Sequence, residues 1–195
     1  MNTTAVQPVS TSERSSMIRL YLVRGFLAIV WAIAFAAAHD PLNAVALTLL
    51  IAYPLIDAVS SAIDYLAVPD GSERRVTALN GALSTLVAIA LGIAGTIGGV
   101  AAVLAVFGIW ATISGAAQLA VGLYRRGPTL GKQWPTLISG GLSFLVGAVY
   151  VSQAIGPAPS LDVLSVYATG GGIFFIAQAA LLIWKSRSQR TTGQV

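Results

Sequence analysis

The sequence predicts an all-α membrane protein, a polytopic bundle of six transmembrane helices. Three observations predict this fold class: the composition, the length of the apolar runs and the placement of the basic residues. The chain of 195 residues is 56% hydrophobic and 9% charged, and its mean hydropathy is +0.80. Roughly a quarter of the residues of a soluble domain are charged. We therefore expect the lipid bilayer to surround most of the chain.

Six apolar runs are each long enough to cross a bilayer as a helix. The shortest of them has 21 residues, about 31 Å at roughly 1.5 Å per residue, and the hydrocarbon core of a bilayer is about 30 Å thick. The predicted helices are residues 18–38, 42–66, 76–96, 99–124, 134–155 and 161–184. The polar residues 1–17 are predicted to form a disordered cytoplasmic tail, and residues 185–195 a basic cytoplasmic tail.

The first run has a second interpretation, as a cleavable signal peptide. Arg14, Arg19 and Arg24 precede or enter an apolar stretch that ends in three alanines at 36–38, and this order is typical of a secretory signal. The run is long for the apolar region of a signal peptide. We therefore favour a retained first helix.

Polar turn residues suit the starts of two helices. Asp40 is expected to cap the second helix, with Pro41 at its first position, where no amide donor is needed. Ser160 is expected to cap the sixth helix.

The basic residues other than Arg24 lie in alternate loops or at the cytoplasmic ends of the apolar runs. In chain order these residues are Arg14 and Arg19, then Arg74 and Arg75, then Arg125, Arg126 and Lys132, then Lys185, Arg187 and Arg190. Cytoplasmic loops of membrane proteins are enriched in Lys and Arg. Both termini are therefore predicted to be cytoplasmic.

The six helices are predicted to form three parallel helical-hairpin repeats. Gly25, Gly81 and Gly140 coincide when the odd-numbered helices are aligned, and the Ala-Gln pairs at 117–118 and 177–178 coincide in the even-numbered ones. Each repeat crosses the membrane twice, so all copies enter it from the same side. A pseudo-threefold bundle is the simplest closed arrangement of such units.

Small residues predict where the helices approach each other. Gly108, Gly115 and Gly122 recur every seven residues on the fourth predicted helix. Lipid supplies no hydrophobic drive between helices, and close packing at small residues replaces it. The residues that we assign to helix packing are Gly25, Gly81, Gly108, Gly115, Gly122 and Gly140.

Two opposite charges lie inside the first predicted hairpin. If the turn centres near Asp40, then Arg24 and Asp57 lie at a comparable depth. Burying either charge alone costs on the order of 3 kcal/mol on insertion scales. We predict that Arg24 and Asp57 form an intramembrane ion pair.

The aligned positions in the other two copies carry neutral polar residues. Asn80 and Ser114 are expected to pair in the second copy, and Ser139 to lie near Gln178 in the third. Two roles stay open for the charged pair: it fixes helix register, or it forms a proton- or ion-responsive site. The candidate supporting residues are Asp64, Asn80, Ser114 and Gln118.

The sequence offers few residues for metal, cofactor or enzyme chemistry. It has no Cys and one His, so thiolate ligands and a cysteine nucleophile are excluded. We predict no metal site, no cofactor and no catalytic residue. The scattered basic residues predict no nucleic-acid interface. His39 is expected on the outer side, and because imidazole changes charge near neutral pH, acid sensing is a minor alternative.

The fifth predicted helix opens with the run Trp134-Pro-Thr-Leu-Ile-Ser-Gly-Gly-Leu142. With the three-hairpin plan, the basic inner loops and the glycine near the start of each odd-numbered helix, this run resembles the HdeD-like family of small bacterial inner-membrane proteins. The likeness extends from Leu20 to Trp184. It implies a multi-pass protein of the bacterial cytoplasmic membrane and a part in the envelope stress response.

The function that we expect is that of a non-catalytic integral membrane protein with a scaffold or accessory role. Its expected partners are the lipid bilayer and either other membrane proteins or further copies of itself. The alternative is a small transporter or channel with a proton- or ion-responsive site around Arg24 and Asp57.

Overall fold

The computed structural model describes residues 11–67, 71–124 and 134–192. Within these ranges the chain is helical and contains no strand. The elements are α1 (Thr11–Ala38), α2 (Ala44–Ala67), α3 (Ser72–Ile93), the π-helical turn η1 (Ala94–Gly98), α4 (Gly99–Tyr124), α5 (Trp134–Ala154) and α6 (Asp162–Thr192). Residues 11–17 and 185–192, which the sequence predicts as tails, therefore extend α1 and α6.

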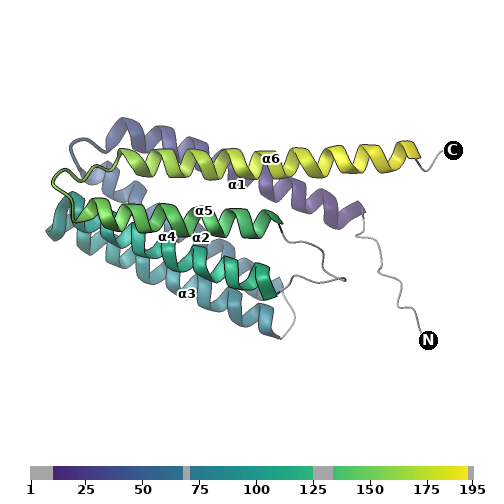
Figure 1. Ribbon diagram of the computed structural model, residues 1–195, viewed down its shortest axis with the longest axis horizontal. Coiled ribbons are helices and arrows are strands. Elements are labelled where there is room, and N and C mark those ends of the chain that lie inside the picture. Colours follow the sequence, from purple (N-terminus) through teal and green to yellow (C-terminus); the bar gives the residue numbers. More distant parts are fainter. Residues whose placement is uncertain (1–10, 68–70, 125–133, 193–195) are drawn as a thin grey trace.

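Five segments are long and apolar enough to cross a membrane: 18–38, 44–63, 74–124, 134–154 and 162–184. The third has 51 residues and contains both α3 and α4. The chain reverses between these two helices at η1 and Gly99 (Figure 1). Gly99 has a φ of 68°, a left-handed conformation that glycine adopts without steric cost.

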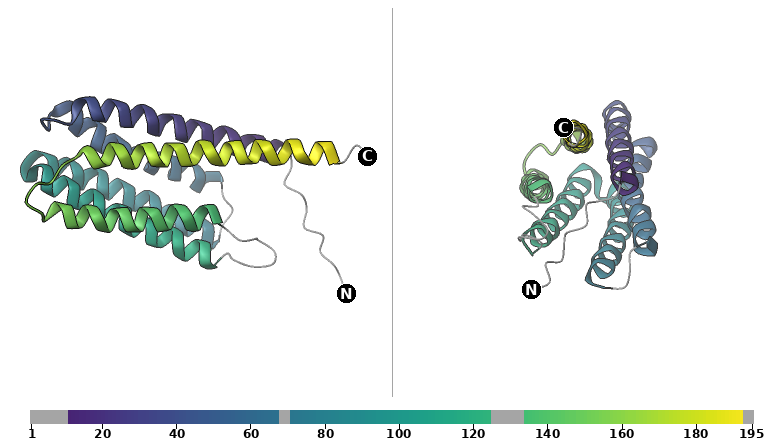
Figure 2. Two further views of the ribbon diagram at one scale, coloured as in Figure 1. Left: turned by 45° about the horizontal axis from the view of Figure 1, so that its top comes forward. Right: turned by 90° about the vertical axis from the view of Figure 1, so that its right-hand side faces the viewer.

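The helices run along the long axis of the molecule (Figure 1). The links from α1 to α2, from α3 to α4 and from α5 to α6 lie at one end, on the left in the figure. The start of α1 and the end of α6 lie at the opposite end (Figure 2, left). Odd-numbered and even-numbered helices therefore run in opposite directions.

The closest helix packing joins α4 to α5, α1 to α6 and α2 to α3. By contrast, α1 and α2, α3 and α4, and α5 and α6 touch through far fewer residues, although each of these pairs is joined by a short link. Each predicted hairpin therefore diverges away from its link, and its helices pack mainly against helices of the neighbouring hairpins.

Glycines lie at all three close helix pairs. A Cβ added to Gly140 would lie 2.9 Å from the carbonyl oxygen of Gly115 on α4, and one added to Gly25 would lie 2.9 Å from that of Gly172 on α6. A Cβ on Gly81 would lie 3.2 Å from the Cβ of Ser61 on α2. All six glycines that the sequence assigns to packing lie at such contacts: Gly25, Gly81, Gly108, Gly115, Gly122 and Gly140.

Aromatic and aliphatic side chains together fill the interior, and many further apolar side chains cover the outside. Trp31, Phe35 and Phe107 are buried, and the indole of Trp31 donates a hydrogen bond of 2.7 Å to the carbonyl oxygen of Leu49, which ties α1 to α2. Large exposed apolar residues lie on every helix, among them Ile33, Ile63, Leu86, Ile109, Val149 and Val166. Such a surface suits contact with lipid.

The start of α2 differs from the prediction. The helix begins at Ala44, and Asn43 caps it because the Asn43 Oδ1 accepts hydrogen bonds of 2.9 and 3.0 Å from the amides of Val45 and Ala46. The Asn43 amide nitrogen also donates to the carbonyl oxygen of Ala38, the last residue of α1. The predicted cap at Asp40 is therefore wrong, since one asparagine closes both helices at this link.

The glycine contacts predict a sharp contrast between two substitutions. Gly140→Ala should lower the free energy of unfolding by about 1–3 kcal/mol, because the new methyl group meets backbone atoms that cannot move aside cheaply. In Gly170→Ala the new Cβ meets nothing within 4 Å, and alanine favours a helix by about 0.5–1 kcal/mol over glycine. Unfolding of the purified protein in detergent, followed by circular dichroism, would measure both. Equal melting temperatures for the two variants would contradict the packing role of Gly140.

Candidate functional site

Four polar side chains meet between α2 and α3, and we call them the Asp57 cluster: Asp57, Ser61, Asn80 and Ser84. The Asp57 Oδ2 accepts hydrogen bonds of 2.9 Å from the amide nitrogen of Asn80 and 2.7 Å from the hydroxyl of Ser84. The Asn80 amide nitrogen also donates to the Ser61 Oγ over 2.9 Å. Ser61 and Ser84 are buried, at 6% and 0% exposure. Asp57 and Asn80 are half-buried, so the cluster is a hydrogen-bonded set that is only partly enclosed.

The spacing of the residues explains why they converge. Asp57 and Ser61 are one turn apart on α2, as are Asn80 and Ser84 on α3, so each pair lies on one helix face. Gly81 follows Asn80 and lets the backbone of α3 approach α2 at this level. Ser61 and Ser84 are not among the site residues predicted from the sequence, although their matched spacing with Asp57 and Asn80 on two helices was the signal for them.

Asp57 places a carboxylate inside an apolar segment that is long enough to cross a membrane. The residue lies about 20 Å from the start of α2 at roughly 1.5 Å per residue, inside the apolar segment 44–63. Carboxylates inside membrane-spanning segments are costly and are usually paired or functional. The described hydrogen-bond partners of Asp57, Asn80 and Ser84, are both neutral.

A simpler version of this contact joins α4 to α5. The Ser139 hydroxyl donates a hydrogen bond of 3.1 Å to the Gln118 Oε1. Ser139 precedes Gly140 as Asn80 precedes Gly81, so both polar residues stand next to a glycine at a close helix contact. The predicted neighbour of Ser139, Gln178, does not take part in this bond.

The expected pair of Asn80 with Ser114 is also wrong. Asn80 bonds to two residues of α2, and the Ser114 Oγ is buried without a hydrogen-bond partner among the described residues. Both errors have one physical cause. Polar partners meet where the backbones are close, at the contacts of α2 with α3 and of α4 with α5, and not within the diverging hairpins.

Two further predicted site residues, Arg24 and Asp64, have no described contact with the Asp57 cluster. Arg24 lies on α1, next to Gly25, which packs against α6. Asp57 takes its described hydrogen bonds from α3, so an ion pair between Arg24 and Asp57 stays a prediction that no described contact supports. The side chain of Asp64 lies outside the described residues, although its backbone belongs to α2.

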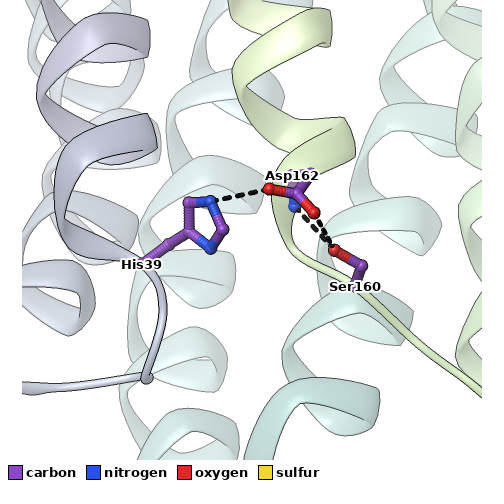
Figure 3. Close-up of polar contacts among 3 residues, drawn as sticks. All are labelled: His39, Ser160 and Asp162. Carbon is purple, nitrogen blue, oxygen red and sulfur yellow. Dashed lines mark hydrogen bonds and ion pairs between the residues drawn. The ribbon is translucent and has the colours of Figure 1, made fainter.

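A second polar group lies at the end of the bundle that holds the links (Figure 3). The His39 Nε2 lies 2.9 Å from the Asp162 Oδ1, and the Ser160 hydroxyl donates a hydrogen bond of 2.6 Å to the Asp162 Oδ2. The backbone amide of Asp162 donates to the Ser160 Oγ, which agrees with the predicted capping role of Ser160. The group thus joins the end of α1 to the start of α6.

The order of contacts in this group argues against nucleophilic catalysis. A catalytic serine gives its proton to a histidine that a carboxylate orients, whereas Ser160 donates to Asp162 and the histidine contacts the other carboxylate oxygen. Asp162 is 72% exposed, and even a fully charged pair so open to water stabilises a protein by only about 0–1 kcal/mol. The group is a surface clasp between two helices.

Two cavities stand out among the described residues, and neither is lined by the Asp57 cluster. One, of about 210 Å³, adjoins the surface clasp and is lined by His39, Asp40, Leu42, Val100, Pro159, Ser160, Leu161 and Asp162. The other, of about 300 Å³, is an apolar groove on α4 and α5, lined by Ile109, Thr112, Ile113, Ala148 and Val151. The side chain of Asp57 is held by its hydrogen bonds to Asn80 and Ser84.

Removing one donor from the Asp57 cluster should destabilise the protein. Ser84→Ala should lower the free energy of unfolding by about 1.5–3 kcal/mol, because a hydrogen bond to a charged group is lost in a buried site. Thr85→Ala is the matched control, since among the described residues the Thr85 hydroxyl bonds to the Gly81 carbonyl oxygen of its own helix, and its loss should change stability by less than about 0.5 kcal/mol. Chemical unfolding in detergent would compare the two, and similar losses would contradict a special role for Ser84.

Comparison of the chain with protein-family models, with curated proteins and with solved structures finds no match.

Proposed function

We propose that this chain is a non-catalytic protein of a bacterial cytoplasmic membrane, that it crosses the membrane six times, and that it acts as a scaffold or accessory protein. The observation that carries the proposal is the set of hydrogen bonds that holds Asp57 between α2 and α3. A transporter needs a wet cavity at its charged site, whereas Asp57 is hydrogen-bonded to Asn80 and Ser84 and lines neither of the two cavities.

Six crossings follow when the 51-residue segment is counted as two. The helices α3 and α4 have 22 and 26 residues, and each is long enough to span about 30 Å of hydrocarbon. The reversal at Gly99 supports this count, because α4 runs back along the bundle antiparallel to α3 (Figure 1).

The distribution of side chains supports an orientation with both termini inside. Arg19, Arg74 and Arg75 lie near the end of the bundle that holds the start of α1. The same end carries exposed aromatic residues, which favour the membrane interface: Tyr65, Tyr124, Trp134 and Trp184. By the excess of basic residues, this end faces the cytoplasm.

The glycine contacts support three related units. Gly25, Gly81 and Gly140, one from each odd-numbered helix, face the carbonyl oxygens of Gly172, Ala58 and Gly115. The three acceptors are equally spaced along the sequence and come from the three even-numbered helices. Repeated hairpins that each pack on the next, with the last closing on the first, would produce this pattern.

The resemblance to the HdeD-like family supports a place in the envelope stress response. The large apolar surface on every helix also leaves room for other membrane proteins or for further copies of the chain. Because Ser160 donates to Asp162 and not to His39, we propose no enzyme activity.

Labelling of single cysteines should establish the topology. The chain has no Cys of its own, so a reporter at Ser72 and another at Ala158 give clean signals. A membrane-impermeant maleimide added to intact spheroplasts should label Ala158→Cys and should label Ser72→Cys only after permeabilisation. Labelling of both residues from the outside would refute the six-crossing arrangement.

The scaffold proposal predicts no ion flux. Proteoliposomes of the full chain should pass H⁺ and Na⁺ no faster than empty liposomes when a pH-sensitive or Na⁺-sensitive dye is trapped inside. Flux that disappears in Asp57→Asn, while that variant keeps the wild-type melting temperature, would instead establish a transporter or channel.

A further inference from the structure

The chain joins the three close helix pairs to one another at one end of the bundle. The links from α1 to α2, from α3 to α4 and from α5 to α6 each connect two different pairs, and all lie at the end shown on the left of Figure 1. The other two links connect α2 to α3 and α4 to α5, which are the helices of one pair. We call the half of each helix nearer to the first three links its link half, and the other half its far half.

The buried apolar core lies in the link halves of the helices and in the links themselves. All six helices contribute to it, and one member from each, in chain order, is Phe35, Leu50, Leu91, Phe107, Tyr150 and Leu164. Among the described residues, the core takes no member from a far half. The side chains that pack the pairs against one another are therefore those of the link halves.

Hydrogen bonds and ring contacts between pairs have the same location. The indole of Trp31 on α1 donates to a carbonyl oxygen of α2, and the ring centroid of Tyr53 on α2 lies 6.0 Å from that of Phe107 on α4. One of the contacts farthest from the links joins the hydroxyl of Ser143, near the middle of α5, to the hydroxyl of Tyr167 on α6 over 3.0 Å. These contacts extend the core as far as the middle of the bundle.

The contacts described in the far halves join helices of one pair. The ring centroids of Tyr21 on α1 and Phe175 on α6 lie 6.0 Å apart, and Ser139 of α5 donates to Gln118 of α4. The Asp57 cluster likewise joins α2 to α3. Each pair is thus held together beyond the level at which the core ends.

Burial in the far halves follows the same division. The buried residues described there are Ala58, Ser61, Gly115, Gly122, Gly140 and Ala179. Ala58 and Ser61 contact Gly81 of α3, and the three glycines lie at the contact of α4 with α5. Ala179 follows Gly172, which packs against α1, by about two turns of helix and so lies on the same face. Burial in the far halves therefore occurs within pairs.

The two kinds of contact differ in how easily they separate. Within a pair, glycines bring the backbones together, and the dense van der Waals contact is lost if the helices part. Between pairs in the far halves, apolar side chains that move apart meet lipid and lose no hydrophobic stabilisation. Regions with few buried contacts are the ones that open most readily. Each pair should therefore move as one body.

We propose that the three helix pairs are rigid units that turn about the core of the link halves, so that their far halves separate and approach. The link at η1 and Gly99 is one place about which they turn, because it joins the pair of α2 and α3 to the pair of α4 and α5. Such hinge motions take microseconds to milliseconds. The inference concerns the mechanics of the bundle and is independent of the scaffold function.

The test measures distances between two spin labels on the full chain in lipid nanodiscs, by pulsed electron paramagnetic resonance. The chain has no Cys, so labels are attached at exposed positions that are changed to cysteine. Ile63→Cys with Ile138→Cys spans two pairs, in the far halves of α2 and α5. One control, Leu123→Cys with Ile138→Cys, lies within the pair of α4 and α5. The other, Val45→Cys with Val149→Cys, joins the link halves of α2 and α5.

Rigid pairs with mobile far halves predict a specific order of widths. The distance distribution between positions 63 and 138 should be about twofold wider than either control, or more, because hinge motion displaces far halves most. Only variants that keep the wild-type melting temperature are compared. Narrow distributions of similar width in all three combinations would overturn the proposal, because the pairs would then be fixed. Wide distributions in all three would overturn it as well, because the pairs would not be rigid.

Cross-linking in native membranes gives a second measurement. Bismaleimides with short and with long spacers should both capture Ile63→Cys with Ile138→Cys, because the far halves sample a range of separations. Val45→Cys with Val149→Cys should react within a single range of spacer lengths. Capture of both combinations by a single range of spacers would refute the motion.

Discussion

Close backbone contact at glycines is the constraint on which the rest of this bundle depends. In lipid the apolar side chains gain nothing by leaving their surroundings, so helices associate where small residues allow tight packing. Here those places join α1 to α6, α2 to α3 and α4 to α5. The short links between successive helices set the chain's path, whereas the glycines decide which helices form pairs.

The polar interactions follow from these contacts. Asn80 and Ser139 each precede a glycine that packs against a neighbouring helix, and each bonds to a side chain of that helix. Because the glycine allows the two backbones to come close, the polar side chain next to it also lies close to the partner helix. It can then satisfy its hydrogen bonds within the protein, as a side chain inside lipid must.

Hydropathy predicts the helices well and their partners poorly. The apolar runs predicted most of each helix, because span length depends on composition alone. The helix pairs could not be predicted from hydropathy. A glycine stripe indicates that another helix packs closely there, but it does not identify that helix. The cap at Asn43 was missed for a related reason: Asp40 and Asn43 both suit a cap, and only the path of the link selects one.

The charge of Asp57 is the part of the site that packing does not explain. Asp57 precedes Ala58, whose carbonyl oxygen faces Gly81, and the residues that precede the corresponding acceptors Gly115 and Gly172 are Ser114 and Gly171. This position thus carries a carboxylate in the pair of α2 with α3, a hydroxyl in the pair of α4 with α5, and no side chain in the pair of α1 with α6. A carboxylate is the costliest of these inside a bilayer. Its presence at the contact of α2 with α3 therefore depends on the hydrogen bonds that Asn80 and Ser84 donate to it across that contact.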